Sequence, residues 1–182
     1  MDVYETCPVF ATPRFTLRLI RKEDAGGLLR VYRDREARPR INADNCTSCF
    51  CFETLREMEE CVNMWMLAYR ERWFVRWTIL ESDKPVGTVE MFRRDDGSDG
   101  RGRGVLRIDV HSLYEFSDVF DELLETMLPQ LHAFFDCAEI LTKAFPSALR
   151  RQESLRAQGF TPTEPLIGHD GTVYGDYWTH RV

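Results

Sequence analysis

Long hydrophobic runs are missing from this sequence. No stretch approaches the roughly 18 consecutive apolar residues that a membrane-spanning helix needs, so we expect no membrane partner. Residues 1–10 lack a basic region followed by an apolar run, and we therefore expect no signal peptide and a cytoplasmic protein. Internal repeats and low-complexity segments are absent as well. With 43% apolar and 30% charged residues, the composition excludes extended disorder and fibrous chains.

Positive charge is in short supply, because 24 Lys and Arg residues face 30 Asp and Glu residues, for a formal charge of −6. Binding to nucleic acid needs clustered cations that contact phosphates, so we expect no nucleic-acid partner. The one dense cationic stretch holds Arg30, Arg33, Arg35, Arg38 and Arg40. We interpret it as a solvated helix end, where cations suit the C-terminal dipole, and a patch that steers an anionic ligand is the alternative.

Metal-ligand patterns are incomplete in this chain. Three of the six cysteines, Cys46, Cys49 and Cys51, lie close enough in sequence to share a zinc ion. A closed structural site needs about four ligands, and the chain has no second CxxC or HxxxH pair. We therefore predict reduced thiols and no metal site. A catalytic cysteine would need a base, and none of the four histidines is near these cysteines in sequence.

The apolar residues that are present suffice for one hydrophobic core. The 182 residues fit one domain, which we expect to span residues 1–182. Alternating apolar residues predict a strand at Phe15–Ile20. Thr54 and Glu57 form a capping-box pattern, and the apolar residues that follow at steps of three and four predict a helix with one buried face.

Applied along the whole chain, these patterns predict strands over 15–20, 73–80, 85–93, 105–111 and 138–145, and helices over 22–33, 54–70, 118–136 and 147–158. Residues 34–53 are expected to be a loop, and the glycine-rich residues 95–104 a mobile connection. Pro129 should kink or divide its helix, and residues 163–181 should form a closing hairpin that turns at His169–Gly171. This order predicts an α+β fold with a strand–helix–strand crossover.

Short motifs are spread over nearly the whole chain, at Thr12–Arg18, Arg21–Asp24, Pro85–Gly87, Gln158–Phe160, and at Asp170–Gly171 with Asp176–Tyr177. Their order and spacing resemble the GNAT N-acetyltransferase superfamily, and within it the branch that acetylates ribosomal-protein N-termini. The resemblance implies a single GNAT-like domain with a mixed, twisted sheet of about six to seven strands and helices on both faces.

The cofactor that this resemblance implies is acetyl-CoA, whose pyrophosphate lies on backbone amides where a strand leads into the long helix. The implied cofactor-binding residues are Val110, Ser112, Tyr114, Ser117, Asp118 and Val119, with Ser117 as a helix cap. For Tyr114, aromatic packing is the alternative interpretation.

The family signature at this place is Arg/Gln-x-x-Gly-x-Gly/Ala, and the chain departs from it. Its three defined positions are held by Glu115, Asp118 and Phe120. Acids stabilise the start of a helix, but they repel a pyrophosphate. A second family pattern, with Asn, Ser and Tyr, falls on residues 148, 151 and 155, where this chain has Ala, Arg and Leu. The pyrophosphate loop is therefore degenerate.

The first hypothesis for function is an acyl-CoA-dependent N-acyltransferase that moves an acetyl group to an amine of a small molecule or a protein N-terminus. Such a reaction needs a base that deprotonates the amine, and the candidates are Glu90, Asp109 and His111. A surface histidine is the alternative interpretation of His111. Tyr174 is the candidate general acid. Backbone groups of 110–112 would receive the thioester.

The second hypothesis is a catalytically inactive GNAT-like binding or interaction domain that has lost the acetyl-CoA site. The missing glycines and the added acids favour it, since a fold does not by itself carry a function. The acceptor amine cannot be named from the sequence, although the loop 34–53 would border the acceptor and its arginines suit an anionic one. The oligomeric state stays open, a homodimer included.

Overall fold

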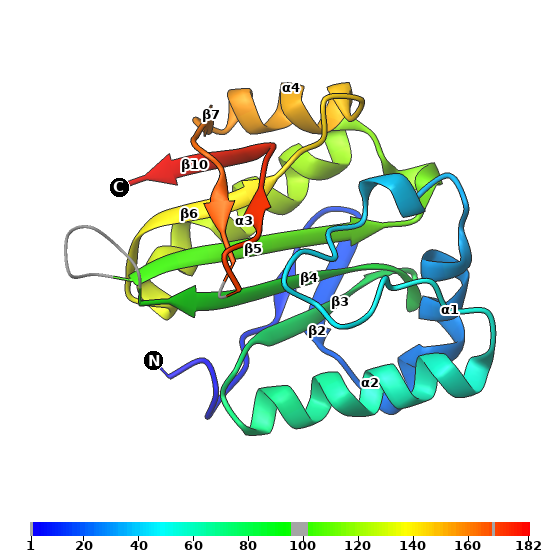
Figure 1. Ribbon diagram of the computed structural model, residues 1–182. Coiled ribbons are helices and arrows are strands. Elements are labelled where there is room, and N and C mark those ends of the chain that lie inside the picture. Colours follow the sequence, from blue (N-terminus) through cyan, green and yellow to red (C-terminus); the bar gives the residue numbers. More distant parts are fainter. Residues whose placement is uncertain (1, 96–101, 169) are drawn as a thin grey trace.

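An open, mixed sheet of eight strands crosses the molecule in the order β1-β2-β3-β4-β5-β6-β10-β7 (Figure 1). The computed structural model describes residues 2–95, 102–168 and 170–182. All neighbouring strands in this sheet are antiparallel except β5 and β6, which run parallel and are joined through a helix. A separate two-stranded hairpin is formed by β8 and β9. The α+β class predicted from the sequence is confirmed.

The strands are β1 (Phe10–Ala11), β2 (Phe15–Leu19), β3 (Val75–Glu81), β4 (Lys84–Arg94), β5 (Gly102–Val110), β6 (Cys137–Lys143), β7 (Thr161–Pro162), β8 (Leu166–Ile167), β9 (Val173–Tyr174) and β10 (Tyr177–Arg181). The α-helices are α1 (Ala25–Arg33), α2 (Leu55–Arg70), α3 (Ser117–Phe134) and α4 (Leu149–Ala157). Short 3-10 turns are η1 (Lys22–Asp24), η2 (Arg38–Arg40) and η3 (Ser112–Tyr114).

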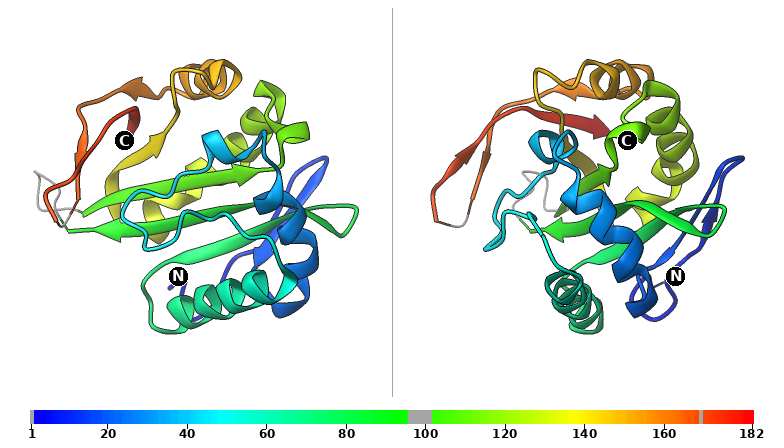
Figure 2. Two further views of the ribbon diagram at one scale, coloured as in Figure 1. Left: turned by 45° about the vertical axis from the view of Figure 1, so that its right-hand side comes forward. Right: turned by 90° about the vertical axis from the view of Figure 1, so that its right-hand side faces the viewer.

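Helices cover both faces of the sheet, as the resemblance implied (Figure 2). On one face, α3 buries Leu123 and Met127 against strand residues such as Ile108, in the larger apolar core. On the other face, α1 and α2 enclose a second core that contains Tyr32 and Trp65. In the part of the chain that the structure describes, no helix is long and apolar enough to cross a membrane.

Several local predictions need correction. Strand β5 begins at Gly102, so the end of the predicted connection 95–104 is strand, and residues 96–101 of that connection lie outside the described residues. Pro129 lies inside α3 and does not divide it. The closing hairpin forms but is shorter than predicted, because β8 pairs with β9 while β10 pairs with β6 and β7. The predicted turn there includes residue 169, which lies outside the described residues. Two-residue strands β1 and β7 were not predicted, since such short edge strands show no alternation.

The parallel pair β5–β6 separates before either strand ends. Hydrogen-bonded pairing runs from Gly102 with Cys137 to Leu106 with Thr142. Residues 107–110 of β5 continue beyond it and pair only with β4 on their other side. The separation opens a gap between the two strands, and the start of α3 and the start of α4 lie at its wide end (Figure 1). This gap places the candidate site.

Helix α1 packs closely on the start of β4, and a glycine permits the contact. A Cβ atom added at Gly27 would lie 2.5 Å from Cγ of Pro85, whereas one added at Gly26 meets nothing within 4 Å. We predict that Gly27→Ala lowers the free energy of unfolding by about 1–3 kcal/mol through overpacking. Gly26→Ala should be neutral or stabilise by up to about 1 kcal/mol, because alanine favours a helix. Urea unfolding of both variants tests this, and equal effects would contradict the close packing.

Candidate active site

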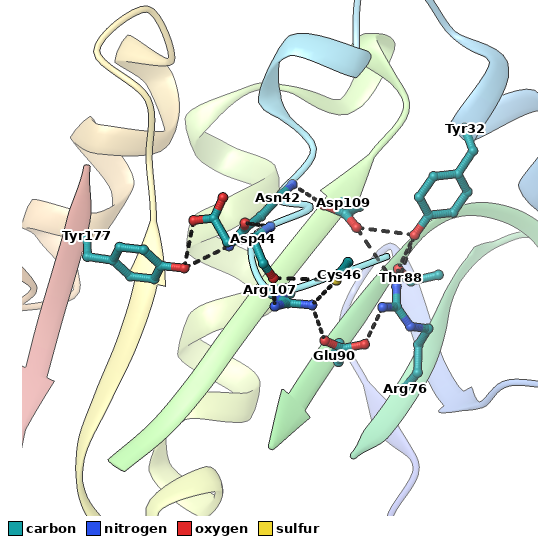
Figure 3. Close-up of polar contacts among 10 residues, drawn as sticks. All are labelled: Tyr32, Asn42, Asp44, Cys46, Arg76, Thr88, Glu90, Arg107, Asp109 and Tyr177. Carbon is teal, nitrogen blue, oxygen red and sulfur yellow. Dashed lines mark hydrogen bonds and ion pairs between the residues drawn. The ribbon is translucent and has the colours of Figure 1, made fainter. Parts of the chain in front are cut away.

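A chain of buried charges crosses the middle of the sheet on the face that α1 and α2 cover (Figure 3). Arg76 of β3, Glu90 of β4 and Arg107 of β5 are neighbours in strand register, and each is at most 6% exposed. One oxygen of Glu90 accepts a hydrogen bond from Arg107 Nη1 at 3.0 Å, and the other accepts one from Arg76. Glu90 is therefore fully occupied by two guanidinium groups. Within the described residues, the Nε atoms of both arginines have no partner.

A second polar branch leads from this chain to the unpaired end of β5. The Tyr32 hydroxyl lies 2.8 Å from Thr88 Oγ1 and donates to Asp109 Oδ2 at 3.2 Å. The backbone N–H of Asn42 donates to the other oxygen of Asp109 at 3.4 Å. Burial raises the pKa of the Asp109 carboxyl, and Arg76, whose Nη1 is 3.8 Å away, opposes the rise. Asp109 is thus a buried carboxyl that holds a proton more readily than an exposed one.

The loop 34–53 crosses the gap between β5 and β6 and ties its two sides together through Asp44. Arg107 donates to the Asp44 carbonyl oxygen, while the Asp44 carboxylate accepts from Lys143 Nζ of β6 at 2.8 Å. The same carboxylate accepts from the Tyr177 hydroxyl of β10 at 3.0 Å. Burial raises the pKa of Tyr177, so this hydroxyl keeps its proton. Asp44 therefore links three strands across the gap, and Figure 3 shows its contacts with Arg107 and Tyr177.

A cavity of about 770 Å³ lies between α2, the loop 34–53 and the sheet. Aromatic side chains line much of it, and its charged lining residues are Arg76, Glu90 and Arg107 at the sheet and Glu57 and Glu60 on α2. Cys46, Cys51 and Cys61 also line it, and all described cysteines are free thiols. No three His, Cys, Asp or Glu side chains of the described residues are grouped so that they could hold a metal ion. The size and mixed lining are those of a small-molecule site.

At the start of α3, the side chain of Glu115 is held by Arg151 of α4. Arg151 Nε and Nη2 each lie 3.0 Å from an oxygen of the carboxylate, and the side chains are only 6% and 8% exposed. The guanidinium also lies over the Phe120 ring, 4.6 Å from its centroid. Glu115 and Phe120 both replace residues of the family's pyrophosphate signature, and both contact Arg151. Arg151 itself replaces the Ser of the second family pattern. They form a single buried cluster that joins α3 to α4.

The other acids of α3 are also partnered within the protein. Asp118 and Glu122 pair with Arg14, at 2.9 and 2.6 Å. Asp121 accepts from Ser154 at 2.6 Å, and Glu125 accepts from Gln158 at 3.2 Å. Arg14 therefore compensates part of the negative charge at this helix start, while Asp121 and Glu125 have neutral hydrogen-bond partners.

The residues predicted to bind the cofactor are only partly available. The Ser112 N–H donates to Asp34 at 2.8 Å, and Val119 is buried in the core. The Tyr114 hydroxyl donates to Glu81 at 2.6 Å, on the side of β3, so Tyr114 contacts the core as the packing interpretation had it. Of the remaining three, Val110 ends β5, Ser117 begins α3, and the Asp118 side chain is 66% exposed.

Ser117 is the first helical residue and not a cap, so that expectation is wrong. The cap position is taken by Phe116, and no side chain caps the helix. Among the described residues, no hydrogen bond reaches the backbone N–H groups of Ser117 and Asp118. These are the groups that a helix start leaves free for an anion.

The structure brings two of the four predicted catalytic residues together. Glu90 and Asp109 belong to the same buried network (Figure 3). His111 lies outside it, half-buried, with Nδ1 at 3.2 Å from the Leu113 nitrogen and 3.3 Å from Asp34 Oδ2. Tyr174 packs on a small separate cluster, and its neighbour in that cluster, Tyr177, is the tyrosine that reaches the gap.

Sequence reasoning missed most of the network. It did not single out Tyr32, Asp44, Arg76, Arg107, Lys143 or Tyr177. A usable signal did exist, because polar residues alternate with apolar ones in three strands that pair with each other. In register, Arg76 lies beside Glu90 and Glu90 beside Arg107. Such a row on one face of a central sheet indicates a buried polar site.

Acetyl-CoA is the cofactor that the family resemblance implies, and the chemistry of the donor set at the α3 start can be tested against it. Arg151 offers a bidentate guanidinium, and Ser117 and Asp118 offer free backbone N–H groups, so an anion fits here. The Glu115 carboxylate already takes the anion's place on Arg151. A pyrophosphate would therefore have to displace Glu115 from Arg151. With the Arg or Gln of the family signature in place of Glu115, no such competition would arise.

The raised pKa of Asp109 makes stability depend on pH in a stated direction. A carboxyl whose pKa is higher in the folded than in the unfolded state contributes to the free energy of unfolding most fully below its unfolded pKa of about 4. That contribution is lost as the pH rises from there through the folded pKa. We predict that Asp109→Asn stabilises the protein more at pH 7 than at pH 4, relative to the wild type. Asp24 is the matched control, because despite its burial the hydrogen bonds from Arg18 and Thr78 lower its pKa. Asp24→Asn should destabilise at pH 7 and lose that effect at low pH. Parallel pH profiles of the two variants in denaturant unfolding would contradict this account.

No family model matches the sequence, and no curated protein matches it. Solved structures do match. A Vibrio cholerae protein assigned as a ribosomal-protein-serine acetyltransferase has a TM-score of 0.74 at 14% identity, with 100% of both chains covered. RimL, a ribosomal L7/L12 α-N-protein acetyltransferase in complex with coenzyme A, has a TM-score of 0.73 at 10% identity, with 96% of this chain and 98% of that chain covered.

An aminoglycoside acetyltransferase, AAC(6′)-Ib in complex with ribostamycin and coenzyme A, has a TM-score of 0.67 at 15% identity. The match covers 92% of this chain and 93% of that chain. At such low identities a structural match establishes the fold and leaves the chemistry to the residues. The chain therefore has the GNAT acetyltransferase fold.

Proposed function

We propose that the protein is an acyl-CoA-dependent N-acyltransferase that moves an acetyl group from acetyl-CoA to an amine. The observation that carries this proposal is the gap between β5 and β6. Its wide end meets the free N–H groups of α3 and the guanidinium of Arg151. Arg107, the first residue of β5 beyond the paired part, lines the cavity. A donor site and an acceptor site thus border the same gap.

On the donor side, Arg151 and the N–H groups of Ser117 and Asp118 would hold the phosphates. When bound, acetyl-CoA supplies an activated thioester. The backbone at Val110, where β5 ends, is the nearest strand end to these groups and suits the polarisation of a carbonyl.

On the acceptor side, Asp109 is the best base among the three candidates. Glu90 already accepts from two guanidinium groups, and His111 lies outside the network. The raised pKa of Asp109 makes its carboxylate the stronger proton acceptor, as general base catalysis requires. Tyr177, whose hydroxyl keeps its proton at the gap, is the candidate acid in place of Tyr174.

A second candidate function is ligand binding without acyl transfer. The specific observation in its favour is the cluster of Glu115, Phe120 and Arg151, which fills the start of α3 from within the protein. If this cluster does not open, the donor site is closed and only the cavity on the other face binds a ligand.

Titration with acetyl-CoA separates the two candidates. For the enzyme we expect a saturable rise in melting temperature, equivalent to about 2.7 kcal/mol at a hundredfold excess over Kd, and release of free CoA when amines are added. Pantetheine, which lacks the phosphates, is the control and should give a much smaller shift. The absence of any shift at millimolar acetyl-CoA would reject the acyltransferase in favour of the binding domain.

Competition between Glu115 and a phosphate for Arg151 makes a second prediction. Glu115→Gln removes the competing charge and should tighten acetyl-CoA binding by about tenfold, a change of about 1.4 kcal/mol. Glu125→Gln is the matched control, because it makes the same chemical change within α3, where Glu125 accepts a hydrogen bond from the neutral side chain of Gln158. Isothermal titration calorimetry measures both. An equal gain in the two variants would indicate general electrostatics and contradict a role of Arg151.

A further inference from the structure

The cavity beside the gap has an apolar wall and a charged floor. Phe50, Trp65, Phe74 and Phe92 are among its lining residues, so a ring or a branched aliphatic chain would find aromatic surface there. Its volume of about 770 Å³ exceeds what one small side chain needs, and it lies within the range of pockets that bind small molecules.

The floor carries two buried guanidinium groups. Arg76 and Arg107 both pair with Glu90, and Arg76 Nη1 also lies 3.8 Å from Asp109 Oδ2. The Nε–H of each arginine lacks an acceptor within the described residues. A buried donor without an acceptor is unfavourable, so a ligand oxygen that accepts from these groups would gain a hydrogen bond that the protein alone leaves unmade.

The acids at the mouth of the cavity already have partners within the protein. Glu57 accepts from the backbone N–H groups at the start of α2, where it completes the capping box with Thr54. Glu60 pairs with Arg56 at 2.9 Å on the exposed side of the helix. Neither carboxylate is left to select a cation. The recognition chemistry is therefore an anionic or acceptor oxygen at the floor and an apolar group at the wall.

The position of Arg107 relates the floor to the proposed reaction. It lines the cavity and also begins the stretch of β5 that has no partner on β6. A carboxylate held at Arg107 would place a neighbouring amine beside the gap. An α-amino acid, whose amine and carboxylate are attached to the same carbon, meets both conditions.

We infer that the cavity binds a free hydrophobic α-amino acid, with its carboxylate at Arg76 and Arg107 and its side chain against the aromatic wall. The inference rests on the proposed function in that the amino acid would be the acceptor amine, but its binding needs no acyl donor.

Calorimetric titration of the wild-type protein without any CoA compound tests the inference. L-Phenylalanine should bind saturably, and L-phenylalaninamide and phenethylamine, which lack the carboxylate, at least tenfold more weakly. L-Serine, which keeps the carboxylate but lacks an apolar side chain, should also bind at least tenfold more weakly. No binding of L-phenylalanine, L-leucine or L-tryptophan at millimolar concentration would overturn the inference. So would equal binding of L-phenylalanine and its amide.

A variant tests the floor directly. Arg107→Lys keeps the charge and loses the guanidinium, and it should weaken L-phenylalanine at least tenfold. Arg93→Lys is the control, because Arg93 pairs with Asp136 and Asp95 away from the cavity, and it should bind like the wild type. If Arg107→Lys fails to fold, as circular dichroism would show, the ligand series decides alone. Equal binding by two folded variants would overturn the inference.

The outcomes separate this inference from the proposed function. Binding of L-phenylalanine without acetyl-CoA binding would leave the inference intact and reject the acyltransferase. Acetyl transfer to other amines without amino-acid binding would do the opposite.

Discussion

The sharing of Glu90 between Arg76 and Arg107 is the interaction on which the centre of the molecule depends. One carboxylate between two guanidinium groups cannot satisfy all of their donors, so other elements must supply acceptors. The loop 34–53 does so through the Asp44 carbonyl, and it is thereby fixed across the sheet. The same arrangement leaves the Nε atoms of both arginines without a partner at a cavity. Strand pairing, loop position and the polarity of the cavity thus follow from one buried charge arrangement.

On the opposite side of the gap, a carboxylate also pairs with a guanidinium group, but here one carboxylate faces one arginine. Glu115 and Arg151 satisfy each other with two hydrogen bonds, so the helix start holds a carboxylate of its own where a related fold would hold a phosphate. Breaking such a pair by removing one partner leaves an uncompensated buried charge. Replacing the carboxylate by another anion avoids that penalty. The pair therefore blocks neutral ligands at this place, while an anion that offers two oxygens can exchange with it.

The fold was predictable because each main element carries its own periodicity. The capping box at Thr54 and Glu57 formed as predicted, and the order of elements pointed to the correct fold. The site was much less predictable. The sequence positions of Glu115 and Arg151 could be matched to family patterns one at a time, but nothing local said that they pair across 36 residues. Likewise, Asp44 lies in a loop without periodicity, and only strand register brings Arg76 beside Glu90.

The central claim is that Arg151 exchanges Glu115 for the phosphates of an acyl donor at the gap between β5 and β6. A crystal structure of the intact protein grown with millimolar acetyl-CoA tests it most directly. The account predicts cofactor density at the start of α3, with the Arg151 guanidinium on phosphate oxygens and Glu115 turned away. An unchanged Glu115–Arg151 pair in cofactor-free crystals, together with no acetyl-CoA binding in solution, would contradict it.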